Sequence, residues 1–335
     1  MKFVRRYLAP RLVQYVLVIF LGITVIFIIP RLMPGGPVES AIANLQARGS
    51  YLDPKAMEAT AHALRQMYGL EGTWPEQYVA FWRRLFTGDF GPSLYQFPTP
   101  VIQLIGQALP WTFGLLLVTT TLSWIVGTVT GGLAGYFPQS RTFGLVDAAA
   151  MFVRPIPYYV LAMVLLILFA YLIPVFPVGR GYTIGAEISL NWSFVSDVLR
   201  SAFLPALSLM LIGAAVSHQT MRLVVEGVKE EDYVRYAKIG AVKESTIFSR
   251  YVMRNAILPL ITSLALSIGQ IFGGALITEM VFSYPGVGFL LFRAVVVNDY
   301  NLIMGITTIS IIAIVTATLI LDLVYPLFDP RIRLK

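Results

Sequence analysis

The sequence lacks cysteine altogether, and only 13% of its 335 residues are charged. The absence of cysteine excludes disulfide bridges, thiolate metal sites and a cysteine nucleophile. Soluble domains usually contain about 25% charged residues. Because the charged fraction is low and the mean hydropathy is +0.73, the composition indicates an all-α integral membrane protein with a small number of membrane-spanning helices.

Several kinds of enzyme site are also missing. The sequence has no G-x-x-x-x-G-K-[ST] phosphate loop, so the chain cannot hold ATP in that way. Its two histidines, His62 and His218, have no evident nucleophile and acid partner, which excludes serine hydrolase chemistry and predicts satisfied or solvated histidines. No cluster of metal ligands is evident. We therefore expect no catalytic residue, no metal and no cofactor in this chain.

Six apolar stretches are long enough to cross roughly 30 Å of hydrocarbon. They predict six transmembrane helices at Leu12–Pro30, Gln107–Gly135, Pro155–Ile173, Ala202–Ser217, Ala256–Thr278 and Leu302–Leu321. The ionisable residues near these stretches lie at or beyond their ends; they are Asp147, His218, Glu279 and Asp322. A proton-coupled carrier or an intramembrane aspartyl protease needs such residues in the middle of the membrane, so the sequence argues against both classes.

The basic residues predict the orientation of these helices. The net charge is +7, and basic residues collect on the cytoplasmic side of membrane proteins. With both termini in the cytoplasm, the inner segments hold most of them, namely Lys2, Arg5, Arg6, Arg11, Arg141, the group from Arg222 to Arg254, and Arg331, Arg333 and Lys335. This topology explains the positive charge better than nucleic-acid binding does, so we expect a multi-pass protein with no nucleic-acid partner.

The topology divides the chain at residue 106. Residues 1–106 are predicted to comprise the first transmembrane helix and an extracytoplasmic segment. This segment contains a helix around Pro54–Tyr68, an aromatic and basic stretch at Tyr78–Phe86 and a turn at Gly88–Ser93. Residues 107–335 are predicted to form a five-helix core with a cytoplasmic loop at residues 222–258.

Glycine and proline predict features of the individual helices. Gly127, Gly131 and Gly135 recur at every fourth position, a spacing that lets helix backbones approach closely. Pro155 and Pro157 are expected to distort the start of the third transmembrane helix.

Three further prolines, Pro110, Pro205 and Pro259, are expected in the first turns of their helices. Proline is tolerated there because the N–H groups of the first turn have no partner within the helix.

The mixed-charge segment Glu231–Pro259 runs straight into the fifth apolar stretch. Acidic residues at 230–232 suit the positive end of a helix dipole, and Gly240 is a natural helix stop. A second helical stretch begins at about Glu244. The sequence therefore predicts two short helices at the cytoplasmic membrane face.

Tyr233, Tyr236 and Ala237 are expected on one side of the first short helix. Aromatic and small residues presented in this way could bind a groove on a soluble partner, with charged residues at the rim giving specificity and fast association. The alternative from the residues alone is an amphipathic helix that lies on anionic lipid.

Short motifs distributed over almost the whole chain resemble those of one family. They are MPGGP at residues 33–37, YGL at 68–70, GDFG at 88–91, DYVR at 232–235, RNAILP at 254–259, TEMVFSYPGVG at 278–288, DY at 299–300 and DPRIR at 329–333. Together they resemble the membrane subunits of binding-protein-dependent ABC importers, specifically the dipeptide, oligopeptide and nickel permease group, in which the segment at 231–259 is the "EAA" coupling loop.

The resemblance implies a type I ABC importer permease fold in the inner or plasma membrane of a bacterium or archaeon. It implies a homologous second permease subunit, two ATP-binding subunits that hold ATP and Mg²⁺, and an extracytoplasmic solute-binding protein as partners, with the lipid bilayer around them. This chain would then have no enzymatic activity. The residues that would bind the ATPase subunit are Asp232, Tyr233, Arg235, Tyr236, Ala237, Gly240, Ala241, Arg254 and Asn255.

The coupling loop departs from the family pattern at one point. The family has glycine four residues after the alanine that corresponds to Ala237, whereas this chain has Ala241 there and glycine one position earlier, at Gly240.

For the substrate, the resemblance implies peptides first and oligosaccharides as the alternative, with nickel chelates a further possibility within the group. The tryptophans and tyrosines of residues 31–106 would suit sugar stacking, partner binding or an interfacial aromatic belt. A secondary carrier or channel is a remote alternative, because it would not need the cytoplasmic segment. A structural membrane scaffold is another, and it would show no substrate-dependent ATP hydrolysis in any complex.

Overall fold

The computed structural model describes residues 8–32, 36–47, 53–183, 185, 189, 191–271 and 275–328. Within these residues the chain forms helices, turns and one isolated β-bridge, with no β-strand, in agreement with the all-α prediction. Several basic residues used to predict the orientation lie outside the described residues, at both ends of the chain; they are Lys2, Arg5, Arg6, Arg331, Arg333 and Lys335. The same holds for residues 33–35 and 329–333 of the family motifs. The cytoplasmic position of both termini therefore stays a prediction.

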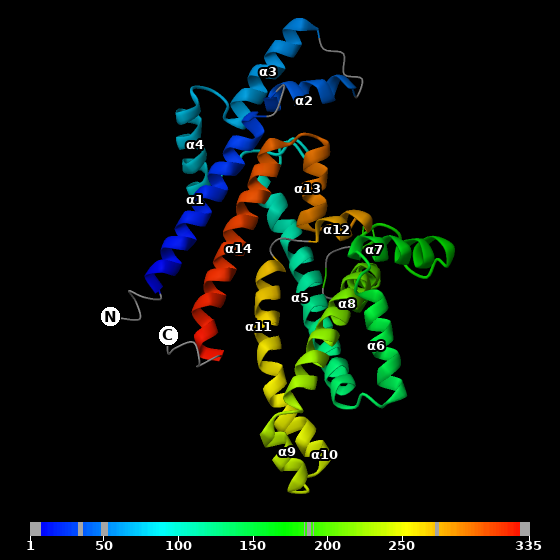
Figure 1. Cartoon of the computed structure of the whole chain (residues 1–335). Helices are drawn as coiled ribbons and strands as arrows, with labels where there is room; N and C mark the ends of the chain where they lie inside the picture. The colour runs from blue at the N-terminus through cyan, green and yellow to red at the C-terminus, as the bar shows by residue number, and fades with distance from the viewer. Residues whose placement is uncertain are drawn as a thin grey trace. The chain divides into compact units, whose positions relative to one another are not determined.

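The helices follow one another along the chain, and the longest connections are residues 88–100 and 173–191 (Figure 1). In chain order they are α1 (Ala9–Leu32), α2 (Gly36–Ala47), α3 (Pro54–Tyr68), α4 (Trp74–Thr87), α5 (Val101–Tyr136), α6 (Arg141–Val153), α7 (Tyr158–Leu166) with the π-helical η2 (Ile167–Leu172), α8 (Trp192–Val228), α9 (Asp232–Ile239), α10 (Glu244–Thr246) with the π-helical η3 (Ile247–Met253), α11 (Arg254–Gln270), α12 (Leu276–Val281), α13 (Val287–Val296) and α14 (Tyr300–Phe328).

Five helical segments among the described residues are long and apolar enough to cross a membrane. They are Ala9–Ile29, Val101–Tyr136, Trp192–Val228, Glu244–Gly269 and Tyr300–Leu323. A sixth crossing requires Arg141–Val153 and Tyr158–Leu172 to act as one span, although the two are bent by 101°. The fold is thus that of a multi-pass helical protein, and the number six remains a prediction.

The bend between α6 and α7 lies where two prolines were expected to distort the helix. Pro155 and Pro157 have no N–H to donate, and their rings clash with the preceding turn, so a helix cannot continue through them undisturbed. The distortion is larger than predicted, because the chain breaks into two helices at this point.

The predicted ends of other helices were wrong because hydropathy marks the apolar part of a helix and not the helix itself. The fourth apolar stretch, Ala202–Ser217, is only the middle of α8, which continues to Val228. Pro110 and Pro205 consequently lie inside α5 and α8 and not in a first turn. Pro259 likewise lies inside α11.

The fifth apolar stretch, Ala256–Thr278, was also predicted as a single helix. The described part of that helix ends at Gln270, residues 272–274 lie outside the described residues, and Thr278 belongs to α12.

The chain packs as two compact units. Unit 1 comprises residues 1–112, 272–276 and 285–335, and unit 2 comprises residues 113–271 and 277–284. This division reflects packing, since it places the last helix with the first, whereas the predicted boundary at residue 106 follows membrane topology. The predicted boundary remains untested.

In unit 1, α1 runs alongside α14 (Figure 1). Gly22 of α1 lies where an added Cβ would be 3.1 Å from the side chain of Ile311, so the small residue permits close packing. Arg11, near the start of α1, forms an ion pair with Asp322, near the end of α14. This ion pair therefore holds the start of α1 against the end of α14.

The predicted extracytoplasmic segment contains α2, α3 and α4. The helix expected around Pro54–Tyr68 has those bounds, because Asp53 accepts a hydrogen bond from the N–H of Ala56 at 2.8 Å and Gly69 ends the helix with a φ of 66°. The aromatic stretch of α4 packs against α1: the Tyr78 and Thr24 hydroxyls lie 2.7 Å apart. Tyr78, Phe81 and Trp82 of α4 thus have a structural role against α1.

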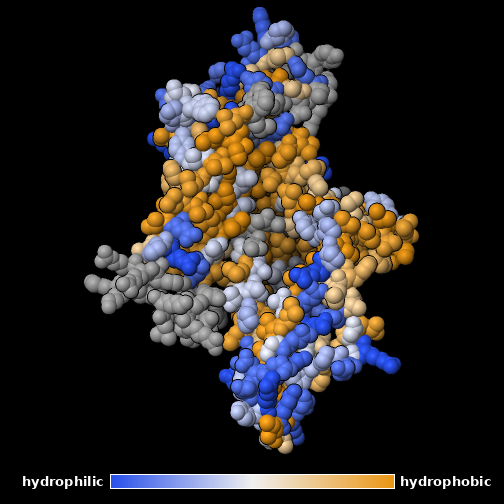
Figure 2. Space-filling model, in the orientation of Figure 1, coloured by the Kyte–Doolittle hydropathy of each residue, from blue (hydrophilic) through white to orange (hydrophobic). Residues whose placement is uncertain are grey.

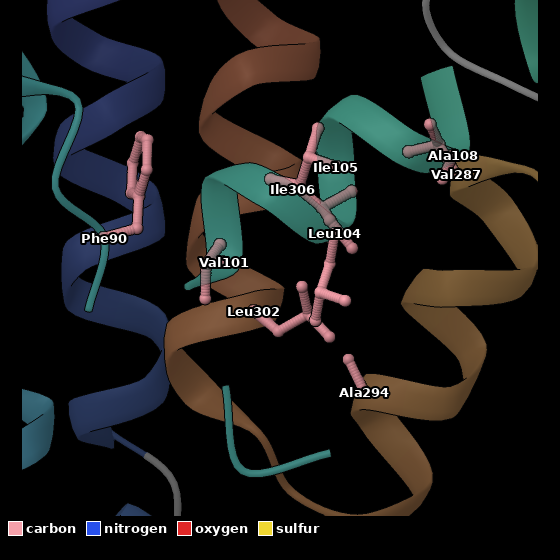
Figure 3. Packing of buried hydrophobic residues seen from close by; sticks show 9 residues of the cluster. All are labelled: Phe90, Val101, Leu104, Ile105, Ala108, Val287, Ala294, Leu302 and Ile306. Atoms are coloured by element: carbon pink, nitrogen blue, oxygen red, sulfur yellow. The ribbon is translucent and has the colours of Figure 1, made fainter. Parts of the chain in front are cut away.

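The largest described cluster of unit 1 joins α5, α13 and α14 (Figure 3). It consists of Phe90, Val101, Leu104, Ile105, Ala108, Val287, Ala294, Leu302 and Ile306. Phe90 comes from the turn that follows α4, so the family motif at residues 88–91 contributes a buried side chain and not an exposed one.

Asp299 is a fully buried acid in the turn before α14. Its carboxylate accepts hydrogen bonds from the Ser93 hydroxyl, from the N–H of Tyr95 at 2.9 Å and from the N–H of Leu302 at 3.1 Å. It therefore caps α14 and fixes the turn after α4 at the same time.

We predict that Asp299→Ala destabilises unit 1 strongly, because two buried donors and one partly buried donor lose their acceptor, at about 1–3 kcal/mol for each donor left buried without a partner. The apparent melting temperature of the purified protein in detergent should fall by many degrees, whereas Glu58→Ala, which removes an exposed acid from α3, should leave it unchanged. Equal melting temperatures for the two variants would show that the Asp299 hydrogen bonds contribute little.

In unit 2 the glycine repeat of α5 lies against the backbone of α8, as the spacing predicted. An added Cβ would lie 2.5 Å from the Ala214 oxygen at Gly127, 2.1 Å from the His218 oxygen at Gly131 and 2.7 Å from the Arg222 oxygen at Gly135. No side chain fits at these distances, so the two helices touch through their backbones.

We predict that Gly131→Ala lowers the apparent melting temperature by several degrees, since overpacking a close contact costs about 1–3 kcal/mol. Gly114→Ala is the matched control on the same helix, because nothing lies within 4 Å of the added methyl group. If Gly131→Ala is as stable as Gly114→Ala, the backbone contact of α5 and α8 is not tight in the protein.

Candidate functional site

The segment predicted to bind a soluble partner folds as two short helices between α8 and α11 (Figure 1). The first, α9, begins after Glu231, carries Asp232 in its first turn and ends at Ile239 with Gly240 as its cap. The second begins at Glu244 and continues without a break into α11. The predicted arrangement of two helices is therefore confirmed.

The inner side of α9 is packed against three longer helices. Its buried residues are Val234 and Ala237. They belong to a buried cluster, here called the insert core, that also contains Tyr136, Met221, Val225, Ile247, Val252, Ala256 and Leu260. Because these residues come from α5, α8, η3 and α11, a displacement of α9 must move those elements with it or break the core.

The expectation that Tyr233, Tyr236 and Ala237 share one side of α9 was wrong. Tyr236 is 72% exposed, whereas Ala237 is 7% exposed and belongs to the insert core. Consecutive residues of an α-helix are separated by about 100° around its axis and do not face the same way. Ala237 thus contributes to packing beneath α9 and not to its exposed surface.

The outer side of α9 presents a mixed surface, here called the docking face, formed by the exposed residues Asp232, Arg235, Tyr236 and Ile239. Ile239 is 81% exposed and was missed in the sequence, although it stands three residues after Tyr236 on the same side. The surface over α9 and α10 is mostly hydrophilic (Figure 2). Exposed Tyr and Arg side chains within such a surface are typical of protein contacts.

Arg235 pairs with Glu230 at 3.2 Å, and both side chains are largely exposed. Exposed pairs contribute only about 0–1 kcal/mol. Arg235 can therefore leave Glu230 for a partner at little cost.

The other predicted contact residues lie at the start of α11, where Arg254 and Asn255 are exposed. The Asn255 amide donates to the Tyr251 oxygen at 2.7 Å and also hydrogen-bonds the Tyr233 side chain of α9. Burial and the Glu231 carboxylate raise the pKa of Tyr233, so its hydroxyl stays protonated. Asn255 therefore contacts α9. Its sequence neighbour Arg254 is exposed.

The turn after α9 explains the shifted glycine. Ala241 has a left-handed φ of 53°, whereas Gly240 has an ordinary φ of −72°. The N–H of Ala241 donates to the Lys238 oxygen and that of Val242 to the Ala237 oxygen, each at 3.1 Å, which is the Schellman pattern with Ala241 in the left-handed position. Ala241, which stands where the family has glycine, thus adopts the left-handed conformation that is typical of glycine.

Polar contacts join this segment to the end of α5. The Tyr136 hydroxyl donates to a Glu244 carboxylate oxygen at 2.6 Å, and the Lys229 ammonium donates to the Gly135 oxygen at 3.1 Å. Nearer the middle of α5, the Trp124 indole donates to the Leu260 oxygen of α11 at 2.9 Å. The insert is therefore attached to α5 as well as to its own flanking helices.

One buried polar network was missed in the sequence. His218 has its ring nitrogens 3.0 Å from the Thr130 hydroxyl and 3.3 Å from the Asp147 carboxylate, and Arg222 forms an ion pair with the same carboxylate. The inference that His218 has no acid partner was therefore wrong, because Asp147 is far away in sequence. The prediction of a satisfied histidine was correct.

The network holds α5, α6 and α8 together, and the Thr130 hydroxyl also donates to the Val126 oxygen of its own helix at 2.7 Å. Among the residues that the structure describes, no group of three His, Asp or Glu side chains is placed to bind a metal ion.

Comparison with known proteins identifies the family. The family model for the inner membrane component of binding-protein-dependent transport systems matches residues 127–334. The chain belongs to this family. The match includes α9 and α10, so the insert described above is part of the family's shared region.

Full-length relatives agree with this assignment. The chain is 30% identical over 316 residues to the oligopeptide transport system permease protein AppB of Bacillus subtilis, covering 94% of this chain and 95% of the relative. It is 30% identical over 310 residues to a putative peptide permease protein of Brucella ovis, with 92% of each covered. It is 26% identical over 333 residues to the dipeptide transport system permease protein DppB of Lactococcus lactis, covering 98% and 99%. The resemblance to peptide-type ABC importer permeases is thereby confirmed.

We predict that Ala241→Gly stabilises the turn after α9, because a left-handed conformation costs a residue other than glycine about 1–2 kcal/mol, of which the greater backbone freedom of glycine in the unfolded chain cancels part. Hydrogen exchange at residues 237–242 should slow severalfold. Gly240→Ala is the control and should change exchange little, because the φ of Gly240 suits any residue. Faster exchange in Ala241→Gly would contradict the assigned turn.

Proposed function

We propose that this chain is one of two membrane subunits of an ATP-driven, binding-protein-dependent importer and forms half of a path for peptides. The observation that carries the proposal is the docking face of α9, supported by an insert core that includes residues of the long helices. Membership of the permease family supports the same role. A surface helix lying on lipid does not need an exposed Arg235 and Tyr236 above a core shared with three other helices.

The docking face would bind an ATPase subunit on the cytoplasmic side. Two such subunits would hold ATP and Mg²⁺, while this chain would hold neither and have no enzymatic activity. Closure of the ATPase pair on ATP would displace α9, and the insert core would pass the displacement to α5, α8 and α11 as packed bodies. The path would then open alternately to the two sides of the membrane.

The remaining parts of the assembly follow from the same role. A homologous second permease subunit would complete the path. Residues 31–106, with α2, α3 and α4, would contribute to the surface that receives an extracytoplasmic solute-binding protein. In this assembly the chain would cross the inner or plasma membrane of a bacterium or archaeon six times, with both termini in the cytoplasm.

Peptides are the substrate class that the relatives favour, since those compared above are named for peptide, dipeptide or oligopeptide transport. Oligosaccharides are the alternative substrate that the resemblance implies, and the aromatic residues of the extracytoplasmic segment would suit sugar stacking. In the structure Tyr78 and Trp82 pack against Phe27 and Phe20 of α1, which leaves fewer aromatic rings for sugars. A secondary carrier or channel would leave the docking face without a role.

We predict that the double substitution Arg235→Glu and Tyr236→Ala separates the chain from its ATPase subunits. Interface residues of these types contribute about 2 kcal/mol or more each when central, so affinity should fall well over tenfold. Co-purification of the ATPase subunits and substrate-stimulated ATP hydrolysis should both be lost.

The matched control is Arg141→Glu, which makes the same charge change at the exposed first residue of α6. It should retain the ATPase subunits and transport. Because Arg235 and Tyr236 are exposed, the double variant should also melt at the normal temperature. Full transport by a stable double variant would overturn the assignment of the docking face.

A further inference from the structure

A groove of about 390 Å³ lies between α5, α8 and α11, entirely within unit 2. Each helix contributes at least two hydroxyl side chains to its wall, including Thr119, Ser123, Ser217, Thr220, Ser263 and Ser267. No charged side chain lines it. Its volume is within the range of about 300–1,000 Å³ that is common for small-molecule sites.

Seven hydroxyl side chains line this groove, here called the hydroxyl groove, and five of them donate their hydrogens to backbone oxygens. Thr119 donates to the Leu115 oxygen at 2.8 Å, Ser263 to the Leu260 oxygen at 2.8 Å and Ser267 to the Ser263 oxygen at 2.9 Å.

Two more hydroxyl groups of the groove also donate their hydrogens to backbone oxygens. Thr220 donates to the Val216 oxygen at 2.9 Å, and Ser123 donates across to the Met210 oxygen of α8 at 3.2 Å. A hydroxyl oxygen that has donated its hydrogen still has lone pairs to accept with. The groove therefore offers hydrogen-bond acceptors at several levels along its three helices, and its occupant must supply the hydrogen-bond donors.

Two sides of α5 differ in chemistry. One side carries Val118, Leu122, Val126 and Val129, all exposed and apolar, which suits hydrocarbon. The other carries Thr119 and Ser123, which are buried and border the hydroxyl groove. Lipid chains supply no hydrogen-bond donors, so they would leave the hydroxyl acceptors of the groove unused.

A glycine keeps the groove open. Gly213 of α8 lines it, and an added Cβ would lie 2.8 Å from the Ser123 hydroxyl oxygen. Any larger residue would push against Ser123 and narrow the groove at this point.

We propose that the hydroxyl groove is a binding site for the peptide main chain on its way through the membrane. Main-chain N–H groups and the N-terminal ammonium are the donors that all peptides share, and the groove supplies acceptors without a charge or a side-chain pocket that would select among them. The inference rests on the proposed function and adds to it the site and the group of the substrate that is recognised.

Because the chain has no cysteine, single cysteines can be placed in the groove without background from this subunit. The test compares Ser217→Cys and Ser263→Cys with Leu122→Cys and Leu266→Cys, which lie on exposed apolar surfaces of α5 and α11. Serine-to-cysteine exchange is nearly isosteric, so the variants should fold. Each is assembled with its partner subunits and treated with a charged methanethiosulfonate, with the cysteine-free chain as background.

The groove cysteines should be modified faster than the controls, on the order of tenfold, since apolar surroundings raise a thiol's pKa and suppress the reactive thiolate. A transported peptide, delivered by its solute-binding protein, should slow modification of the groove cysteines severalfold and leave the controls unchanged. Modification at Ser263→Cys should stop uptake while the ATPase subunits remain bound.

Three results would overturn the inference. Groove and control cysteines could react equally slowly, as expected if the second permease subunit or lipid fills the groove. Peptide could leave modification unchanged in a complex that still transports it. An oligosaccharide could protect where peptide does not. The proposed function fails separately, if the cysteine-free chain assembles no ATPase subunits and transports nothing.

Discussion

At Gly127, Gly131 and Gly135 the backbones of α5 and α8 touch, and the rest of unit 2 is arranged around this contact. On one side of the contact along α5 lie Ser123 and Trp124, which border the hydroxyl groove. On the other side lies Tyr136, which belongs to the insert core and hydrogen-bonds Glu244. A backbone contact leaves no flexible side chains between the two helices, so α5 and α8 move as one body. The groove and the docking face are therefore connected by a single stiff pair of helices, and this is the physical requirement for one to respond to the other.

Polar contacts prevent this pair from sliding. Thr130 of α5 meets His218 of α8, which in turn meets Asp147 of α6. A slide of one helix by one turn would separate a buried histidine from both of its partners, at a cost of several kcal/mol for the unpaired groups. Glycine contacts alone would allow such a slide, because glycine has no side chain that interlocks with the facing helix. The buried network thus specifies the register that the close packing leaves open.

The sequence was a good guide where a local signal determines the structure. Asp53 with Pro54 and Gly69 defined both ends of α3, and the glycine spacing of α5 indicated a backbone contact before the partner helix was known. It was a poor guide where residues that are distant in the sequence determine the structure. The ends of α8 depend on packing beyond its apolar part, and the partner of His218 comes from another helix. The insert was located from its charge pattern, but its exposed side was partly misread at Ala237, because a short helix of eight residues contains few positions that indicate which side is buried.

At the turn around Ala241, the buried contacts of the insert core prevail over the local preference of glycine. Local preference would place the left-handed conformation at Gly240, where glycine adopts it without strain. The structure places it one residue later, at Ala241. Moving it back would shorten α9 by one residue and shift the Schellman bonds away from Ala237 and Val242, both of which pack in or against the insert core. The buried contacts of that core outweigh a strain of about 1–2 kcal/mol at a single residue. The position of the docking face is therefore set from beneath, by the packing of α9 on the long helices, and this is the property that a helix needs if a force applied to it is to reach them.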